Sequence, residues 1–211
     1  MIGGKRIGRL SSDRSLTLMT VGQIRARSAE AKAGRRLQIL DCAAVLCAQS
    51  GYDELAVSDV AERAGLAKGT IFRYFPTKED LGRALAEAHL ARWSDDLDRR
   101  LARIPGPPAP DAAARLLVES LAGRRELLGL AARGLAPTRP LDDAPAAAAL
   151  ERALPYLEPD GGGARLMRTA LASAAGLRAT LADDAPLPGE LHHALSSHLA
   201  GLRAGSRRAS V

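Results

Sequence analysis

The sequence predicts an all-α protein of about nine helices, and three observations lead to this prediction. No segment alternates β-branched and polar residues for the length of a strand. From about residue 35 onward, apolar residues instead recur at the three- and four-residue spacing of one helix face. Clusters of proline and glycine at 105–110, 137–145, 155–163 and 183–189 divide this pattern into lengths typical of helices.

The predicted helices follow in chain order from these interruptions and from residues that suit helix ends. Pro76 ends the third helix because a proline ring cannot continue the hydrogen-bond ladder. Thr77 and Asp80 then form a capping-box pattern at the start of a long fourth helix. The expected helix ranges are 35–50, 57–64, 68–74, 77–103, 111–122, 124–135, 144–157, 164–182 and 189–203.

The composition excludes several classes of protein. Of the 211 residues, 46% are hydrophobic, 26% charged and 3% aromatic, which suits a folded core built mainly from alanine, leucine and valine. Cys42 and Cys47 lie about 7.5 Å apart along one predicted helix, too far to form a disulfide with each other. The longest uncharged stretch, 42–52, is much shorter than the ~20 residues that span a bilayer. We therefore expect a soluble, cytoplasmic protein with no membrane partner; a secretory signal at 15–24 is the weaker alternative.

The positive charge is concentrated at the N-terminus. The whole chain has a formal net charge of +6. Residues 1–36 contain nine basic and two acidic residues, a net charge of +7, so the rest of the chain is close to neutral. We expect residues 1–33 to be a basic, disordered arm of the kind that holds polyanions by counterion release. The alternative is that Met19 is the true initiator, in which case residues 1–18 have no function.

The most informative segment is 57–75, VSDVAERAGLAKGTIFRYF, which predicts two short helices around a tight turn at Gly65. Its apolar residues would point inward together: Val60, Ala64, Leu66, Ile71 and Phe75. The second helix would then present Lys68, Gly69, Thr70, Phe72 and Arg73 outward, as a helix-turn-helix presents residues to the DNA major groove. The alternative is that this is one of the many helical bundles in which a glycine turn never meets DNA.

The next helix favours the DNA-binding interpretation. Lys78 occupies its first turn, where a cation is unfavourable next to the helix dipole unless an anion lies close. A DNA phosphate at the helix N-terminus would be that anion. The alternative is a solvated Lys78 paired with Glu79 or Asp80.

Residues 39–81, ILDCAAVLCAQSGYDELAVSDVAERAGLAKGTIFRYFPTKEDL, resemble the DNA-binding domain of the tetracycline-repressor (TetR) family of transcription regulators. The resemblance is most specific at AGLAKGTIFRYFPTKEDL. It implies a helix-turn-helix DNA-binding domain at 34–80, a helical ligand-binding and dimerisation domain at 81–205 and a tail at 206–211. It also implies a homodimer that binds double-stranded DNA at a near-palindromic operator.

The resemblance assigns roles to individual residues of the segment. Those matching Lys68, Gly69 and Thr70 approach base edges in the family, and the one matching Lys78 holds a phosphate. Phe72, Arg73 and Tyr74 match residues that contact bases or backbone, and their side chains suit such contacts.

This chain departs from the family pattern at several positions. Ala56 and Ala67 replace hydroxyl residues that usually cap the second and third helices. We therefore add Ser58 to the expected DNA-binding residues, as the hydroxyl that compensates from the next turn. Phe72 lacks the hydroxyl of a common family tyrosine, and Cys47 replaces a usual core phenylalanine.

The last two helices are expected to form the dimer interface, with the core of the same chain as the alternative use of these residues. The expected interface residues are Leu166, Ala170, Ser173, Leu177, Leu191, Leu195, His198 and Leu202. A pocket for an apolar effector is expected between the helices of this domain, with Arg178 meeting an acidic group. The expected pocket residues are His89, Trp93, Leu127, Leu130, Tyr156 and Arg178.

Nothing in the sequence indicates an enzyme, a cofactor or a metal site. His192 and His193 near Ser196 are interpreted as a polar helix end, and the glycines at 161–163 as a loop. The expected function is a ligand-responsive DNA-binding transcriptional regulator, a repressor released by its effector. The alternative is a helical protein that binds a small molecule or a partner and keeps the helix-turn-helix only as structure, which the missing hydroxyls of Ala56 and Ala67 would favour.

Overall fold

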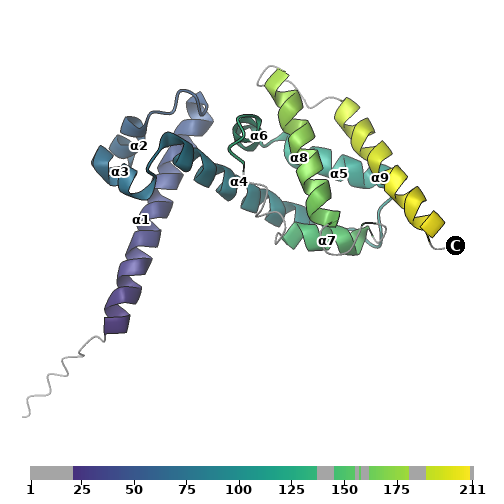
Figure 1. The fold of residues 1–211 in the computed structure, drawn as a ribbon, viewed down its shortest axis with the longest axis horizontal. Coiled ribbons are helices and arrows are strands. Elements are labelled where there is room, and N and C mark those ends of the chain that lie inside the picture. Colours follow the sequence, from purple (N-terminus) through teal and green to yellow (C-terminus); the bar gives the residue numbers. More distant parts are fainter. Residues whose placement is uncertain (1–20, 137–144, 155–156, 158–161, 181–188, 210–211) are drawn as a thin grey trace, which may run out of the picture. The chain divides into compact units, whose positions relative to one another are not determined.

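The computed structural model describes residues 21–136, 145–154, 157, 162–180 and 189–209. Within these ranges the chain forms nine α-helices and no strand, which confirms the all-α prediction (Figure 1). The helices are α1 Val21–Ser50, α2 Val57–Ala64, α3 Lys68–Tyr74, α4 Lys78–Leu101, α5 Pro110–Ala122, α6 Arg125–Ala132, α7 Pro145–Ala153, α8 Gly162–Thr180 and α9 Gly189–Ala209.

The largest difference from the predicted boundaries is at the first helix. α1 begins at Val21 and not near residue 35, so residues 21–33, which we expected to be irregular, are helical. Hydrophobic periodicity detects helices that pack against something, and every described residue from Ser28 to Gln38 is exposed. The helix is consistent instead with the intrinsic propensity of its alanine, arginine and lysine residues. Residues 1–20 of the predicted arm lie outside the described residues.

Contacts divide the chain into two units, 1–37 and 38–211, each of which is described by itself. In the second unit, the end of α1 packs with α2, α3 and the start of α4 around one apolar core. The larger side chains of this core are Ile39, Leu40, Leu55, Val60, Ile71, Phe75, Leu81 and Leu85. Gly65 follows α2 with a φ of 64°, a left-handed conformation that favours glycine, as the sequence predicted.

A second core joins the remainder of α4 to α5, α6, α7, α8 and α9, and it is built mostly from leucine and alanine. Helix α9 packs along α5, where Leu191, Leu195 and Leu199 are buried. Helices α7 and α8 cross closely at Gly163, since a Cβ there would lie 2.0 Å from the carbonyl oxygen of Ala147. None of the described helices is long and apolar enough to span a membrane.

Helix α6 and the turn after it contribute to both cores. Leu127 and Leu128 belong to the second core, whereas Leu130 and Leu135 are buried in the first. This short segment therefore links the helix-turn-helix to the helical body. A shift of its last turn would change the packing of both cores.

Candidate nucleic-acid interface

Helix α3 has one anchored side and one exposed side. Ile71 and, just after the helix, Phe75 are buried in the first core. Lys68, Gly69 and Arg73 are exposed on the other side. Phe72 also lies there, and 41% of its surface is accessible although it is one of the largest apolar residues of the chain. Thr70 and Tyr74 are half-buried at the edges of this surface, which we call the α3 surface: Lys68, Gly69, Thr70, Phe72, Arg73 and Tyr74.

The N-termini of α2 and α3 lack side-chain caps, as their alanines predicted. Neither Ala56 nor Ala67 provides a capping hydrogen bond. Ser58 is exposed, but it does not replace the missing cap, because its hydroxyl donates to Oδ1 of Asp59 at 3.1 Å. Our expectation that Ser58 compensates was wrong for the cap. Ser58 lies two residues after the N-cap position Ala56, too far along α2 for its hydroxyl to act as the cap.

Helix α4, in contrast, is capped as predicted. The hydroxyl of Thr77 accepts from the backbone N–H of Asp80 at 3.0 Å, and the carboxylate of Asp80 accepts from the backbone N–H of Thr77 at 3.2 Å. This reciprocal pair fixes the chain direction between α3 and α4. It therefore also fixes the backbone position of Lys78, the first residue of α4.

Lys78 has partners that the sequence did not predict. Its Nζ donates to the backbone carbonyl of Asp53 at 2.8 Å and lies 5.0 Å from the centre of the Tyr52 ring. The hydroxyl of Tyr52 in turn donates to the backbone carbonyl of Lys78 at 3.1 Å. Tyr52 fits there because position 82 is glycine, where a Cβ would lie 2.7 Å from its ring. Partial burial also raises the pKa of Tyr52, so its hydroxyl stays a donor.

Asp53 connects this corner to the helical body. Its carboxylate accepts two hydrogen bonds from the guanidinium of Arg133, the residue that follows α6; the Nε bond is 2.8 Å long. These bonds lower the pKa of Asp53. Nothing in the sequence pairs these residues, which are 80 positions apart. The only local signal was the turn at Gly51, which precedes Tyr52 and Asp53 and has a φ of 83°.

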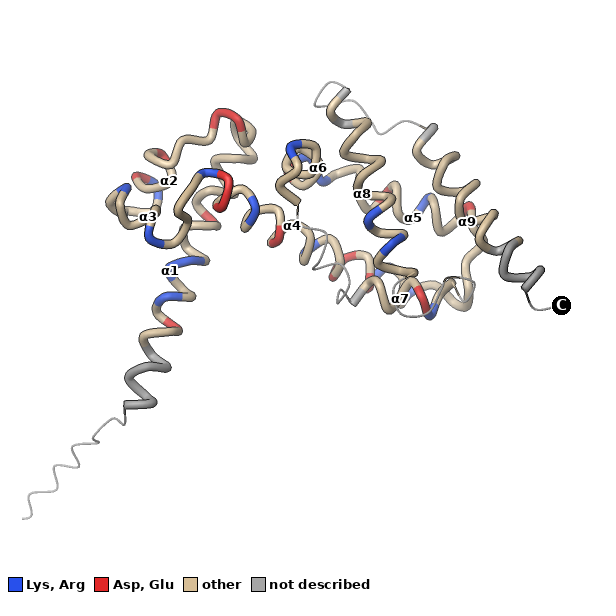
Figure 2. Tube along the Cα trace, in the orientation of Figure 1, with Lys and Arg blue, Asp and Glu red and all other residues tan. Residues whose placement is uncertain are grey.

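Charges near the α3 surface are unevenly divided. In Figure 2, Lys and Arg lie along α3, and acidic residues lie on α2 and in the turn after α1. The first turn of α4 carries Lys78 together with the acidic Glu79 and Asp80. Lys68, Arg73 and Lys78 are all wholly or partly exposed. Together with the apolar Phe72, they form a surface that can hold phosphates and contact base edges.

The structure does not bring the six predicted pocket residues together around one cavity. Trp93 and Leu127 are fully buried in the second core, and the indole N–H of Trp93 donates to the hydroxyl of Ser120 at 2.8 Å. His89 is half-buried, which lowers its pKa. Tyr156 and the side chain of Arg178 lie outside the described residues. Trp93 and Leu127 are among the large side chains that fill the core between α4 and α6, and their place in an effector pocket stays a prediction.

Three cavities can be described in this part of the chain. One of about 310 Å³ lies between the end of α1 and α6 and has Cys47, Tyr52, Glu126, Leu130 and Arg133 in its lining. Of the predicted pocket residues whose side chains the structure describes, Leu130 lines this cavity, and His89, Trp93 and Leu127 line none of the three. Burial raises the pKa of the Cys47 thiol there.

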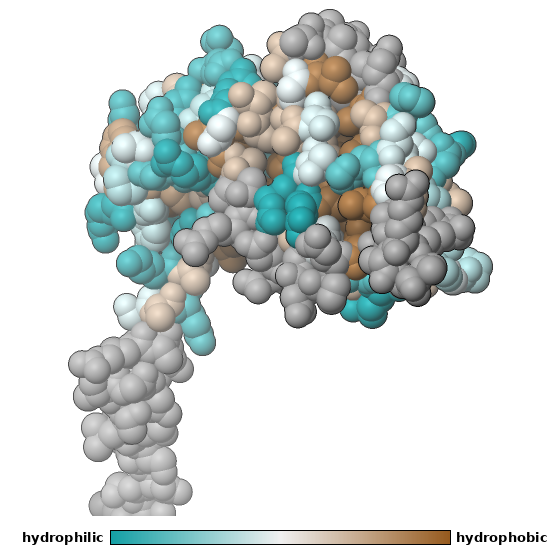
Figure 3. All heavy atoms as spheres, turned by 45° about the vertical axis from the view of Figure 1, so that its right-hand side comes forward, coloured by the Kyte–Doolittle hydropathy of each residue, from teal (hydrophilic) through white to brown (hydrophobic). Residues whose placement is uncertain are grey.

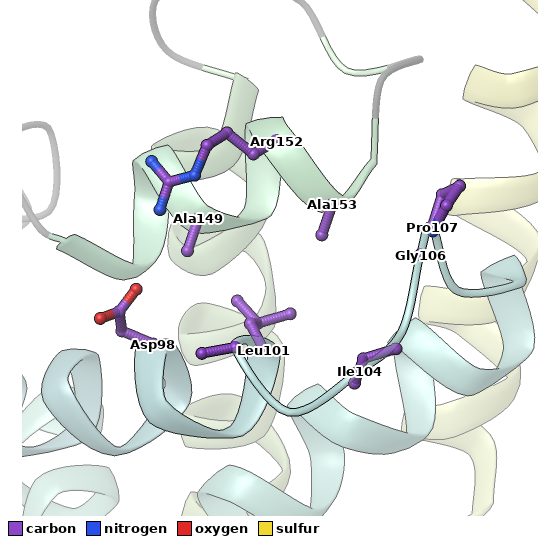
Figure 4. Close-up of a pocket in the computed structure, with 9 residues that line it drawn as sticks. Asp98, Leu101, Ile104, Gly106, Pro107, Ala149, Arg152 and Ala153 are labelled. Atoms are coloured by element: carbon purple, nitrogen blue, oxygen red, sulfur yellow. The ribbon is translucent and has the colours of Figure 1, made fainter.

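A second cavity, also about 310 Å³, lies between α6 and α8. Alanines from both helices line it together with Leu171, Gly176 and Arg168. The third, about 290 Å³, lies where α4 ends beside α7, with Asp98 and Arg152 at its edge (Figure 4).

The predicted interface residues of α8 and α9 are divided between two environments. Leu166, Ala170, Leu191 and Leu195 are buried in the core of the same chain, which is the alternative use that the periodicity left open. Leu177 is half-buried and packs against the same core. The exposed members are Ser173, His198 and Leu202.

The family model for "Bacterial regulatory proteins, tetR family" matches residues 39–85, which contain the α3 surface and Lys78. The transcriptional repressor KstR of Rhodococcus jostii is 42% identical over 79 residues, 37% of this chain and 35% of KstR. The fatty acid metabolism regulator protein of Bacillus subtilis is 34% identical over 67 residues, 32% of this chain and 34% of the regulator. The matches thus span about a third of the length of these curated relatives.

The likeness of fold extends further along the chain than the likeness of sequence. The crystal structure of RolR in complex with resorcinol matches 85% of this chain and 94% of RolR, with a TM-score of 0.59 and 19% identity. At that identity the match concerns the fold, which confirms the predicted architecture. Residues 39–85 are thus similar in sequence to the tetR family of bacterial regulatory proteins.

Proposed function

We propose that this chain is a ligand-responsive transcriptional regulator, a repressor that binds a near-palindromic operator as a homodimer and leaves it when a small-molecule effector binds. The observation that carries the proposal is the α3 surface, where basic and apolar side chains are exposed on a helix that is anchored from behind by Ile71 and Phe75. Such a protein acts on DNA in the cytoplasm and needs no cofactor.

In the proposed complex, α3 enters the major groove. Arg73 can form two hydrogen bonds with O6 and N7 of a guanine, and Phe72 can contact a thymine methyl group. Lys78 exchanges the carbonyl of Asp53, 2.8 Å away, for a DNA phosphate. The exchange replaces a neutral carbonyl with a charged phosphate as the acceptor for Lys78, so the bound state with DNA is favoured over the free chain.

A homodimer would place two α3 helices about 34–36 Å apart, or a multiple of that, to reach successive major grooves. The outward faces of α8 and α9 support this assembly, because several of their exposed residues are small and uncharged: Ala172, Ser173 and Gly176 on α8, and Ser197, Ala200 and Gly201 on α9. The larger exposed residues of these helices include Arg165, His193, His198 and Leu202. Small residues let helices approach closely across a two-fold axis. Figure 3 shows apolar surface in tan and brown on the helical body, between hydrophilic patches.

The cavity between α6 and α8 is the effector site that we favour. Its alanine and leucine lining suits an apolar molecule, and Arg168 in its wall suits an acidic group on that molecule. Ala131, Ala132 and Ala136 of this wall flank Arg133, which holds Asp53. An effector that binds more tightly when the end of α6 is displaced would weaken the ion pair between Arg133 and Asp53. The α3 helix would then leave the position in which it fits the operator.

A gel-shift titration against a duplex that the wild-type chain selects from a random library tests the DNA-binding part of the proposal. Arg73→Ala is expected to relax base preference at one position of each half-site, by about 1–3 kcal/mol. Lys78→Ala is expected to weaken binding evenly across sequences and to reduce the salt slope by about 1. Arg103→Ala, an exposed arginine after α4, is the control and should change neither quantity.

Two results would contradict the proposal. If the wild-type chain shifts no duplex even at low salt, the helix-turn-helix is only structural and the alternative function stands. If Lys78→Ala leaves the affinity and its salt dependence unchanged, Lys78 does not contact a phosphate.

A further inference from the structure

We propose that the first half of α1, residues 21–37, is a second DNA-contacting element in addition to the α3 surface. The inference rests on the proposed function and deepens it, because it assigns to the same duplex a contact outside residues 39–85. The first supporting observation is the positive charge of the segment. Five of these 17 residues are basic and one, Glu30, is acidic, whereas the chain after residue 36 has a net charge close to neutral.

The exposure of this segment shows that the helix does not serve a core. Every described residue from Ser28 to Leu37 is exposed, and Leu37 has 60% of its surface accessible. Because the described part of this helix packs against no core, its basic side chains are accessible to a large anionic partner. The described part of this segment carries Lys32, Arg35 and Arg36 against Glu30, and both kinds of charge are visible on it in Figure 2.

The spacing of the charges gives the segment a basic side. Lys32 and Arg36 are four residues apart and lie one above the other on the same face, with Arg35 next to them. Glu30, at 100° per residue, lies on the opposite side of the helix. In the sequence, Arg25 and Arg27 precede these residues. A 17-residue helix is about 25 Å long, and a duplex carries one phosphate per ~1.7 Å of its axis.

The neighbouring residues also suit a phosphate backbone. Ala29 and Ala33 are small, so a duplex can approach the helix without large side chains in the way. The segment is covalently continuous with the part of α1 that packs in the DNA-binding domain, since both belong to one helix, Val21–Ser50. DNA is therefore the occupant that the charge favours, and self-association of the segment is an outcome of the test.

The test compares two full-length triple variants that remove the same charge. One is Lys32→Gln/Arg35→Gln/Arg36→Gln, in which glutamine keeps the helix propensity. The other, a matched control on the body, is Arg92→Gln/Arg103→Gln/Arg115→Gln, all exposed residues. Affinity for the duplex selected by the wild-type chain is measured at four salt concentrations, and helix content is checked by circular dichroism.

The α1 variant is expected to bind about 100-fold more weakly near 0.1 M salt, with a salt slope reduced by 2 to 3, because each lost phosphate contact removes about 0.9 from the slope. The body variant should stay close to the wild type. Equal slopes for the two variants, with or without a change in oligomeric state of the α1 variant, would overturn this inference and leave the proposed function standing. A wild-type chain that binds no duplex would overturn both.

Discussion

Arg133 and Asp53 form a bidentate ion pair that joins the end of α6 to the turn after α1. The Nε of Arg133 lies 2.8 Å from Oδ1 of Asp53, and a second guanidinium nitrogen donates to Oδ2. The backbone carbonyl of Asp53 also accepts a hydrogen bond from Nζ of Lys78. One residue of a surface turn therefore contacts both the helical body and the lysine that we propose holds a phosphate.

Removing the charge of Asp53 tests this link. Asp53→Asn is expected to lower the free energy of unfolding at pH 7 by no more than about 1 kcal/mol, because the pair is exposed to solvent. Glu54→Gln removes the same charge from the adjacent exposed residue and is the control. Urea unfolding of both variants measures the difference; an equal effect of the two would show that the ion pair adds nothing.

The same ion pair predicts a dependence of stability on pH. Arg133 lowers the pKa of Asp53 in the folded chain below its unfolded value of about 3.9. The pair therefore stabilises the fold fully above about pH 4, and this contribution is lost as the pH falls through the lowered pKa. The difference in unfolding free energy between wild type and Asp53→Asn should be constant from pH 5 to 7 and shrink below pH 4. A difference that grows on acidification would contradict the assignment.

Gly82 and Gly69 form a matched pair of helical glycines with opposite expectations. At Gly82 a Cβ would lie 2.7 Å from the Tyr52 ring, whereas at Gly69 it would meet nothing within 4 Å. Gly82→Ala is expected to cost about 1–3 kcal/mol by displacing the ring under Lys78. Gly69→Ala should gain up to about 1 kcal/mol from helix propensity, yet weaken DNA binding because it thickens the α3 surface. Thermal and urea unfolding measure the stability of the two variants, and gel shifts measure DNA binding by Gly69→Ala. Equal stability of the two variants would contradict the packing of Tyr52.

The buried pair of Trp93 and Ser120 should behave as one unit. Ser120→Ala leaves the indole N–H of Trp93 without its acceptor at 2.8 Å and is expected to cost about 1–3 kcal/mol. Combined with Trp93→Phe, it should cost less than the sum of the two single changes, because the orphaned donor is gone. Ser173→Ala on the exposed side of α8 is the control, expected within about 0.5 kcal/mol of wild type. Strict additivity in urea unfolding would contradict the pairing.

The outward face of α9 can be tested by oligomeric state. Ala200→Arg is expected to shift the proposed dimer to monomer, because a long cation cannot be buried against its copy across a two-fold axis. Ala112→Arg, at an exposed position of α5, makes the same substitution elsewhere and should not. Sedimentation equilibrium measures both. A wild-type monomer, or dimers of both variants, would exclude this face as the interface.

Replacing the absent cap of α3 should strengthen it. Ala67 has the extended backbone of an N-cap residue, with φ of −68° and ψ of 142°, but no side-chain acceptor. Ala67→Ser is expected to raise the free energy of unfolding by about 0.5–2 kcal/mol, as a serine there can accept from α3's free N–H groups. Ala122→Ser at the end of α5 should give no such gain. If both serines act alike in urea unfolding, capping of α3 does not limit the stability of the DNA-binding domain.

The sequence by itself determined the helices that pack, the turn at Gly65 and the orientation of the α3 surface. These features depend on periodicity, on glycine and on capping residues such as Thr77, all of which are local and can be read within one or two turns of helix. The start of α1 was missed for the same reason, because a helix that buries nothing has no apolar stripe to read.

Only the tertiary structure decided how the helices share their residues. Whether Leu191 and Leu195 face α5 or a partner, and whether Trp93 lines a pocket or fills the core, depends on neighbours far along the chain. The ion pair of Arg133 with Asp53 is of the same kind, since two surface charges 80 residues apart carry no mutual signal in sequence. Side-chain packing and long-range pairing arise when the chain folds back on itself, and no local pattern encodes that.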